Sequence, residues 1–347
     1  MTMGIRLSIC IPTYNRELFL ADTLESIITQ LDTDIRSSVE ICISDNASTD
    51  NTEDLVEKYS EVHPHIVYHK WPQNMGADRN YLKVVEIAHG EFCWLFGSDD
   101  VMMPGAIKRV LTELETQPDI VLYERAESDK KLCSEPRYSR WTGLRGDYDF
   151  DSKQARGRFL QYLSACHSFG GLFSYLSVIV FRHSRWQSIA NKDRFVGSAY
   201  VHVHVLLEIL KQGADFHYRS AVVVLCRTGN DSFLSDESIS GNYRRIRLDV
   251  DGYREIPGYV FGVDSEEYQL IRLLVARCLP VSGLMKYKLA FLRMGDNESS
   301  RKMNRMLLAN GFIFKHLCLK LLENRVLLMV FTLLSRFNRA ANSVIPT

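Results

Sequence analysis

Residues 7–16 read Leu-Ser-Ile-Cys-Ile-Pro-Thr-Tyr-Asn-Arg, an apolar run that stops at a proline and continues as a polar loop. A short apolar run that ends in this way is typical of a buried strand followed by a loop. Leucines and isoleucines at three- and four-residue spacings follow between residues 18 and 31, which predicts a helix. The chain is therefore expected to open with a strand, a polar loop and a helix.

This order of strand and helix continues to about residue 115. Strands that alternate with helices indicate β-α-β units and a parallel sheet that is covered on both faces. Ligands of such sheets bind beyond the carboxyl ends of the strands, and polar clusters follow three of the strands here. We therefore expect the clusters at 12–16, 44–50 and 97–100 to form one site. The expected strands are 39–43, 66–69 and 91–96, and the expected helices are 53–59, 77–88 and 104–115.

The alternation of predicted strands and helices stops after about residue 124. Residues 125–158 are rich in Arg, Lys, Asp and Ser, which predicts an irregular loop. Overall we predict an α/β fold with a first domain over 1–235, in halves 1–124 and 125–235, and a helical C-terminal region over 236–347. The later expected elements are strands at 178–181 and 221–226 and helical segments at 199–212, 265–295 and 302–337.

Composition excludes several classes of protein. The 42 basic and 42 acidic residues of the chain balance, which argues against a nucleic-acid partner. None of the eight cysteines forms a Cys-x-x-Cys pair, so neither a zinc cluster nor a redox motif is indicated, and free cysteines fit a reducing compartment. Since the sequence shows neither a charged leader before an apolar stretch nor 18 uninterrupted apolar residues, we expect a cytoplasmic protein.

Three blocks in this order and at these intervals resemble the family-2 glycosyltransferases. They are Ser-Ile-Cys-Ile-Pro-Thr-Tyr-Asn-Arg at 8–16, Ile-Ser-Asp-Asn-Ala-Ser-Thr-Asp at 43–50 and Gly-Ser-Asp-Asp at 97–100. The resemblance covers about residues 5–115. It implies a GT-A fold, meaning a Rossmann-like, mostly parallel sheet flanked by helices, with 1–124 as the nucleotide-sugar half and 125–235 as the acceptor half. It also implies a CDP-, UDP- or GDP-linked sugar donor and a Mn²⁺ or Mg²⁺ cofactor.

The acidic pair Asp99 and Asp100 suits such a donor. A divalent cation held by one or two carboxylates can neutralise a sugar diphosphate as its glycosidic bond breaks. The resemblance implies that Asp100 binds the metal and that Asp99 binds the ribose and contributes to the metal site. Many members of the family carry a third acidic residue where this chain has Gly97. A helix cap is the structural alternative for the pair.

The resemblance also implies a donor pocket. Tyr14 would stack on the nucleobase, Asp45 would accept a hydrogen bond from its edge, and Arg79 would contact the phosphates. A turn and cap signal is the structural alternative for the block around Asp45. The implied donor-binding residues are Pro12, Thr13, Tyr14, Asn15, Arg16, Asp45, Asn46, Gly76, Arg79, Asn80, Ser98 and Asp99.

The catalytic base is predicted on a late helix. Counting back from Gly213 places Val201 and His202 where the family often has a Glu-Asp pair, within Tyr-Val-His-Val-His at 200–204. Imidazole can take a proton at neutral pH or bind a metal. We expect His202, with His204 as second choice, to be the base or a metal ligand, and an ordinary pair of helix histidines is the alternative.

Two further segments offer candidates for the acceptor. Tyr175 lies in Phe-Ser-Tyr-Leu-Ser at 173–177, while Arg227 and Asn230 follow a predicted strand. These residues would contact the acceptor or a phosphate, and structural turns are the alternative. The first of these segments and the His-x-His helix are also similar to O-antigen sugar transferases, including abequosyltransferases.

The C-terminal region combines apolar and basic residues. Residues 312–337 are rich in Leu, Phe, Ile and Val and carry Lys315, Lys320, Arg325 and Arg336. Basic amphipathic helices bind anionic membrane surfaces. We therefore expect a peripheral protein on the inner face of the plasma membrane with a lipid-linked saccharide acceptor, and a homodimer interface or packing on the catalytic domain is the alternative.

Two other functions share parts of this pattern. A nucleotidyltransferase would have a parallel sheet and an acidic metal site, but also a glycine-rich phosphate loop after the first strand, where this chain has Pro-Thr-Tyr-Asn-Arg. A non-catalytic carbohydrate-binding relative would keep the pocket and lose the metal carboxylates, and both carboxylates are present.

Overall fold

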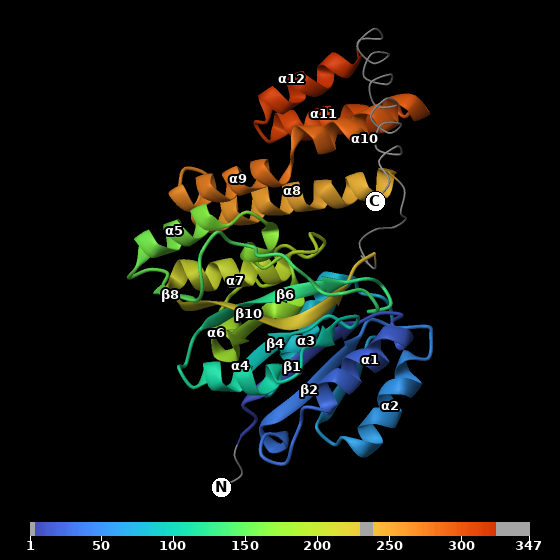
Figure 1. Cartoon of the computed structure of the whole chain (residues 1–347), viewed down its shortest axis with the longest axis vertical. Helices are drawn as coiled ribbons and strands as arrows, with labels where there is room; N and C mark the ends of the chain where they lie inside the picture. The colour runs from blue at the N-terminus through green and yellow to red at the C-terminus, as the bar shows by residue number, and fades with distance from the viewer. Residues whose placement is uncertain (1–3, 230–238, 324–347) are drawn as a thin grey trace. The chain divides into compact units, whose positions relative to one another are not determined.

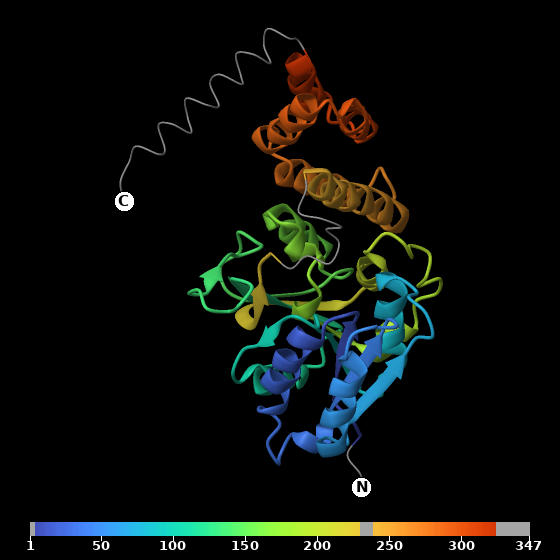
Figure 2. The same cartoon turned by 90° about the vertical axis from the view of Figure 1, so that its right-hand side faces the viewer.

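The computed structural model describes residues 4–229 and 239–323 (Figures 1 and 2). The chain divides into two compact units, one of Met1–Asp231 with Glu255–Leu274 and the other of Ser232–Arg254 with Val275–Thr347. The first unit thus includes a stretch beyond residue 235 that the predicted first domain leaves out. Asn230 lies outside the described residues.

The first half of the sheet is parallel, as the alternating pattern predicts. In sheet order the strands are β3, β2, β1 and β4, and every pairing among them is parallel. Every residue of β1, β2 and β4 is buried and most of them are apolar, and α3 packs on β1 and β2. The elements are β1 (Leu7–Thr13), α1 (Glu17–Ile28), β2 (Val39–Asp45), α2 (Thr52–Val62), β3 (Ile66–Lys70), α3 (Ala77–Glu86) and β4 (Phe92–Leu95).

The second half makes the sheet mixed. β9 is antiparallel to both β4 and β6, whereas β6 and β10 are parallel to each other. The fold class is confirmed as a sheet flanked by helices, but its parallel part is confined to β1–β4 and to the β6–β10 pair. The elements are β5 (Val101–Met102), α4 (Ala106–Leu114), β6 (Ile120–Ser128), β7 (Arg137–Tyr138), β8 (Tyr148–Asp151), α5 (Arg156–Ala165), β9 (Ile179–Arg182), α6 (His183–Gln187), α7 (Val201–Gln212) and β10 (Asp215–Arg227).

The predicted loop over 125–158 is wrong in part. The strand β6 extends to Ser128, β7 and β8 lie within the range, and α5 begins at Arg156. Glu124 on β6 is buried because its Oε1 accepts hydrogen bonds from the Tyr218 hydroxyl and, at 3.2 Å, from the Trp141 amide. A charged residue with such partners is tolerated inside a sheet. In the sequence, however, it interrupts the apolar run from which a buried strand is predicted.

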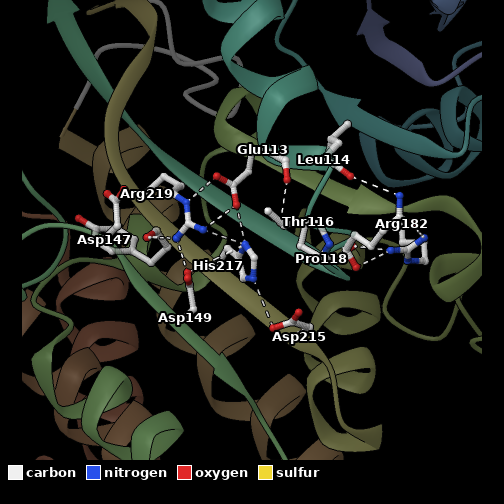
Figure 3. A network of polar contacts seen from close by, with 12 residues as sticks. Glu113, Leu114, Thr116, Pro118, Asp147, Asp149, Arg182, Asp215, His217 and Arg219 are labelled. Atoms are coloured by element: carbon white, nitrogen blue, oxygen red, sulfur yellow. Dashed lines mark hydrogen bonds and ion pairs between the residues drawn. The ribbon is translucent and has the colours of Figure 1, made fainter.

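A network of charged side chains ties α4 to β10 and β8 (Figure 3). Glu113 of α4 contacts Nδ1 of His217 at 2.5 Å and accepts hydrogen bonds from Arg219 at 2.6 and 2.7 Å. Arg219 also pairs with Asp149 of β8. Burial alone would raise the pKa of Glu113, but the hydrogen bonds from His217 and Arg219 lower it to about 2.

This network predicts an acid-sensitive contribution to stability. The folded-state pKa of Glu113 lies below its ordinary value of 4.5, so its contribution is complete above pH 4.5 and is lost as the pH falls towards 2. Glu113→Gln should lower the free energy of unfolding at pH 7 by about 2 kcal/mol and flatten its pH dependence between these values. Urea unfolding across this pH range measures both effects, and parallel pH profiles for variant and wild type would contradict the prediction.

The remaining helices are α8 (Ile239–Phe261), α9 (Glu266–Cys278), α10 (Val281–Met294), α11 (Asn297–Ala309) and α12 (Ile313–Lys320). In the second unit, the buried Lys288 of α10 donates to Glu323 at 2.6 Å and to Asn304 of α11 at 3.2 Å, which joins these helices. Over the described residues, no helix has the length and apolar character needed to cross a membrane. The predicted helical segment 302–337 is formed by two helices, α11 to Ala309 and α12 from Ile313 to Lys320, with a break at 310–312, and its end past residue 323 lies outside the described part.

Candidate active site

The acidic pair follows β4 at the edge of the sheet where the neighbouring strand β1 also ends. Asp100 is only 4% exposed. Its Oδ1 accepts a hydrogen bond from the Tyr175 hydroxyl at 2.6 Å, and its Oδ2 accepts one from Ser177. The pair is not a helix cap, because α4 starts at a left-handed Gly105 without a side-chain cap. The alternative reading of the pair as a cap is therefore wrong.

The surroundings of Asp100 suit a cation. Burial and, after it, the charge of Asp99 raise the pKa of Asp100 to about 7, although hydrogen bonds from Ser177 and Tyr175 act in the opposite direction. Two crowded carboxylates resist being ionised together unless a positive charge offsets their repulsion. A divalent cation would supply that charge.

Gly97 lets the two carboxylates come together. A Cβ atom at this position would lie 2.9 Å from Oδ2 of Asp100 and 3.2 Å from Oδ1 of Asp99. The two oxygens therefore face one small space, and an acidic side chain at Gly97 would clash with both. No group of three His, Cys, Asp or Glu side chains suited to a metal occurs among the described residues. The site thus fits a cation held by two carboxylates that takes its other ligands from phosphates and water.

Arg227 contacts the backbone of the acidic pair. Its Nε donates to the backbone oxygen of Asp99 at 2.9 Å, and its guanidinium also contacts the carbonyl of Lys130 and the carboxylate of Asp22. Each of its three nitrogens donates to an oxygen of the protein and the side chain is only 4% exposed. The contact of Arg227 with acceptor or phosphate stays a prediction. The side chain fixes the backbone on which Asp99 and Asp100 stand.

The predicted nucleobase pocket lies where β1 and β2 end side by side, since Thr13 pairs with Asp45. Asp45 is fully buried, and its carboxylate accepts hydrogen bonds from the amide and hydroxyl of Ser48 and, at 2.9 Å, from Tyr68. Tyr14 is 42% exposed, as a stacking platform requires. Asn15 has a φ of 51°, and its backbone amide donates to Ser48 at 2.8 Å. A non-glycine residue held at positive φ marks a loop that its surroundings fix.

The block from 74 to 80 packs against the same loops. Asn80 donates to the backbone oxygens of Ser44 and Thr13 at 2.8 and 3.2 Å, which holds the ends of β1 and β2 together. Asn46 bonds to Asn74 at 2.9 Å. Asn80 and Asn46 thus hold these loops in place, and Arg79 between them in the chain is exposed. Of the other predicted residues, Pro12, Thr13 and Ser98 are buried, Gly76 has a φ of 84°, and Arg16 lies over the ring of Phe19.

The predicted catalytic role of the two histidines does not fit their surroundings. His202 is 2% exposed, its Nε2 lies 2.9 Å from the backbone oxygen of Phe173, and burial lowers its pKa to about 4. His204 is also buried, with its ring 4.9 Å from that of Phe195 and 5.8 Å from that of Tyr259. A general base must present a nitrogen to the acceptor, and both rings bury theirs. Counting back from Gly213 locates His202 in α7, but it does not show that the ring is buried.

Asp78 is an important residue that the sequence alone does not single out. Its carboxylate is 4% exposed and accepts hydrogen bonds from the amides of Gly197, Ala199 and Val201 at 2.7, 2.9 and 3.1 Å. It therefore anchors the start of α7 from a helix that lies about 120 residues earlier in the chain. Acidic residues favour helix N-termini, but only the fold brings this pair of elements together.

Comparison with known proteins identifies the family of the chain. Residues 8–179 match the family described as Glycosyl transferase family 2. The chain is 38% identical to the abequosyltransferase RfbV of Salmonella typhimurium over 72% of this chain and 74% of that protein. Its fold is similar to Staphylococcus aureus TarS 1–349 in complex with UDP-GlcNAc, with a TM-score of 0.53, 15% identity, and 86% and 90% of the two chains covered.

A second solved structure is also similar. The mannosyltransferase PcManGT from Pyrobaculum calidifontis, in complex with GDP-Man and Mn²⁺, aligns with a TM-score of 0.54 and 14% identity. The alignment covers 92% of this chain and 87% of that one. These two structures establish the likeness of fold, and the similarity to the Salmonella enzyme establishes kinship. The chain belongs to glycosyltransferase family 2.

Proposed function

We propose that this glycosyltransferase uses a nucleoside-diphosphate sugar and needs Mn²⁺ or Mg²⁺ at Asp99 and Asp100. The observation that carries the proposal is the convergence of these two carboxylates on the space beside Gly97, next to the ends of the parallel strands. The similar folds solved with UDP-GlcNAc and with GDP-Man and Mn²⁺ support it. Family membership also answers the nucleotidyltransferase alternative.

The residues divide the work of donor binding. A bound divalent cation supplies positive charge to the diphosphate as the leaving group departs. Asp100 and Asp99 would hold that cation, Tyr14 offers an exposed ring to the nucleobase, and Arg79 offers a cation to the phosphates. In a single displacement, the acceptor oxygen bonds to the anomeric carbon as the bond to phosphate breaks. The proton of the acceptor hydroxyl passes to a base, and the nucleoside diphosphate departs.

The transferred sugar is the finer part of the proposal. The 38% identity to an abequosyltransferase makes abequose the first sugar to test, and an O-antigen precursor the first acceptor. The aligned part covers most of both chains, so it extends beyond the donor half. Hexoses carried by CDP, UDP or GDP are the other donors to compare.

Nucleotide binding tests the donor site directly. Thermal unfolding should shift upward with one of CDP, UDP or GDP, and the shift should grow when Mn²⁺ is added, because ligands that bind the folded state stabilise it. A Tyr14→Ala variant should lose most of that shift, whereas the exposed Tyr138 serves as a control for the loss of a surface tyrosine. No shift with any nucleotide, or an equal shift without metal, would contradict the donor model.

We further propose a lipid-linked acceptor at an anionic membrane surface. The residues Ile313, Phe314 and Leu317 of α12 and the adjacent Leu321 are all exposed, and we call them the α12 apolar face. Residues 286–323 contain eight Lys or Arg and three Asp or Glu. Exposed apolar side chains beside an excess of positive charge suit the boundary of an anionic bilayer.

Vesicle binding tests this surface. The double variant Phe314→Ser with Leu317→Ser should lose most of its cosedimentation with phosphatidylglycerol vesicles, because it removes apolar area that inserts below the headgroups. Leu18→Ser, at an equally exposed apolar position in α1, is the matched control. Unchanged vesicle binding would refute the assignment, and a dimer that dissociates in the double variant would make the face a homodimer interface.

A further inference from the structure

The segment 173–177 contacts the acidic pair. Its Tyr175 and Ser177 donate hydrogen bonds to the two different oxygens of Asp100. The Ser177 hydroxyl in turn accepts a hydrogen bond from the amide of Gly97 at 2.8 Å. Because that hydroxyl has one hydrogen and accepts from Gly97, its hydrogen is directed at Asp100. The carboxylate is therefore fixed in rotation and in position.

These contacts leave room for a ligand on Asp100. Each carboxylate oxygen has two lone pairs, and a single hydrogen bond occupies only one of them. Carboxylates that bind metals are commonly oriented by such neighbouring donors, which are as important to the site as the ligands. We propose that Tyr175 and Ser177 are positioning residues that set the affinity of Asp100 for its cation. This inference rests on the metal site in the proposed function.

The tyrosine is itself held in place. The guanidinium of Arg125 lies 3.9 Å from the centre of the Tyr175 ring, and the ring of Trp141 is 6.3 Å away. Arg125 also donates to Glu127 at 2.6 Å, and this hydrogen bond helps to hold the guanidinium over the ring. A cation over the ring face is attracted to the ring, which holds the phenol beside Asp100. These neighbours therefore hold the Tyr175 ring in place, with its hydroxyl directed at the carboxylate of Asp100.

His202 belongs to the same arrangement. Phe173 at the start of the segment is fully buried and has a φ of 66°, a left-handed conformation that costs energy in a residue with a side chain. The carbonyl of Phe173 accepts the hydrogen bond from Nε2 of His202, whose neutral ring can donate there. We assign His202 a positioning role through Phe173, in place of the base that its sequence position predicts.

Direct binding of Mn²⁺ to the full chain tests the two hydroxyl groups. Titration of MnCl₂ followed by the electron paramagnetic resonance of free Mn²⁺ gives the affinity without catalysis. Tyr175→Phe and Ser177→Ala should each weaken it by about tenfold. The matched controls are Tyr123→Phe and Ser168→Ala, whose buried hydroxyls have no partner among the described residues. Both controls should bind Mn²⁺ as the wild type does.

The outcomes separate the inference from the proposed function. If Asp100→Asn loses Mn²⁺ while Tyr175→Phe and Ser177→Ala bind it normally, the positioning role is refuted and the metal site stands. If Asp100→Asn binds Mn²⁺ as well as the wild type, the metal site and the positioning role fall together. Melting temperatures measured beside the titration ensure that only folded variants are compared.

A rescue experiment tests His202. His202→Leu removes the donor to Phe173 and should weaken Mn²⁺ binding, whereas His202→Gln keeps an N–H donor of similar reach and should restore most of it. His204→Leu changes an equally buried ring that packs against Phe195 and Tyr259, and should leave Mn²⁺ affinity unchanged. Equal affinities for His202→Leu, His202→Gln and wild type would overturn the positioning role of this histidine.

Discussion

Replacing Asp100 with Asn should reduce sugar transfer by about a thousandfold or more while the protein remains folded. The substitution keeps the shape of the side chain but removes the charge that would hold a divalent cation. It also removes a buried carboxylate whose pKa is raised by burial and by Asp99, so the variant should melt at the same temperature as the wild type or higher. Product formation with saturating donor and Mn²⁺, together with thermal unfolding, measures both effects.

The control for this variant is Asp54→Asn, which removes a carboxylate at an exposed position of α2. It should retain full activity. Transfer by Asp100→Asn within a few-fold of the wild-type rate would show that this carboxylate does not serve the metal. A variant that fails to fold would instead indicate that the charge is structural, in conflict with the energetic cost that burial imposes on it.

Removing the Asp78 carboxylate should produce the largest loss of stability among the variants considered. Asp78→Ala leaves three backbone amides at the start of α7 without their acceptor, those of Gly197, Ala199 and Val201. The amides of Ala199 and Val201 are buried, whereas Gly197 is exposed. Buried donors without partners cost about 1–3 kcal/mol each, and the helix N-terminus also loses its negative charge. We expect the free energy of unfolding to fall by about 4 kcal/mol, measured by urea denaturation at pH 7.

Asp54→Ala again provides the comparison, since its exposed carboxylate lies in the first turn of α2 and should cost only a few tenths of a kcal/mol. Asp78→Asn should fall between wild type and Asp78→Ala, because one acceptor oxygen remains. If Asp78→Ala were as stable as Asp54→Ala, the three hydrogen bonds would not anchor α7 as the structure indicates.

Local patterns predict the donor half of the fold well. The strands β1, β2 and β4 are short, mostly apolar runs that end in polar residues, and the first helices show regular apolar spacing. These strands and helices can therefore be predicted without knowledge of the fold. The strand β6 cannot be, because Arg125 and Glu127 interrupt its apolar run. Their placement depends on partners such as Tyr175, which lies far along the chain.

The candidate site divides in the same way. Asp99 and Asp100 follow a predicted strand, so their position at the sheet edge can be inferred from the order of elements. The contacts of Asp100 with Tyr175 and Ser177 join residues 75 and 77 positions apart, and no local pattern encodes them. The role predicted for His202 does not fit its surroundings for a related reason. Counting along a helix finds its position, but it cannot show that its ring is buried against the carbonyl of Phe173.

The most direct test of the central claim is the release of nucleoside diphosphate in the presence of a saccharide acceptor, with and without metal. The protein is treated with EDTA, offered the donor whose nucleotide stabilises it most, and assayed before and after Mn²⁺ is restored. The site at Asp99 and Asp100 predicts negligible release in EDTA, recovery with Mn²⁺ in the wild type, and no recovery in Asp100→Asn. Equal acceptor-dependent release in EDTA and in Mn²⁺, or full recovery in Asp100→Asn, would contradict it.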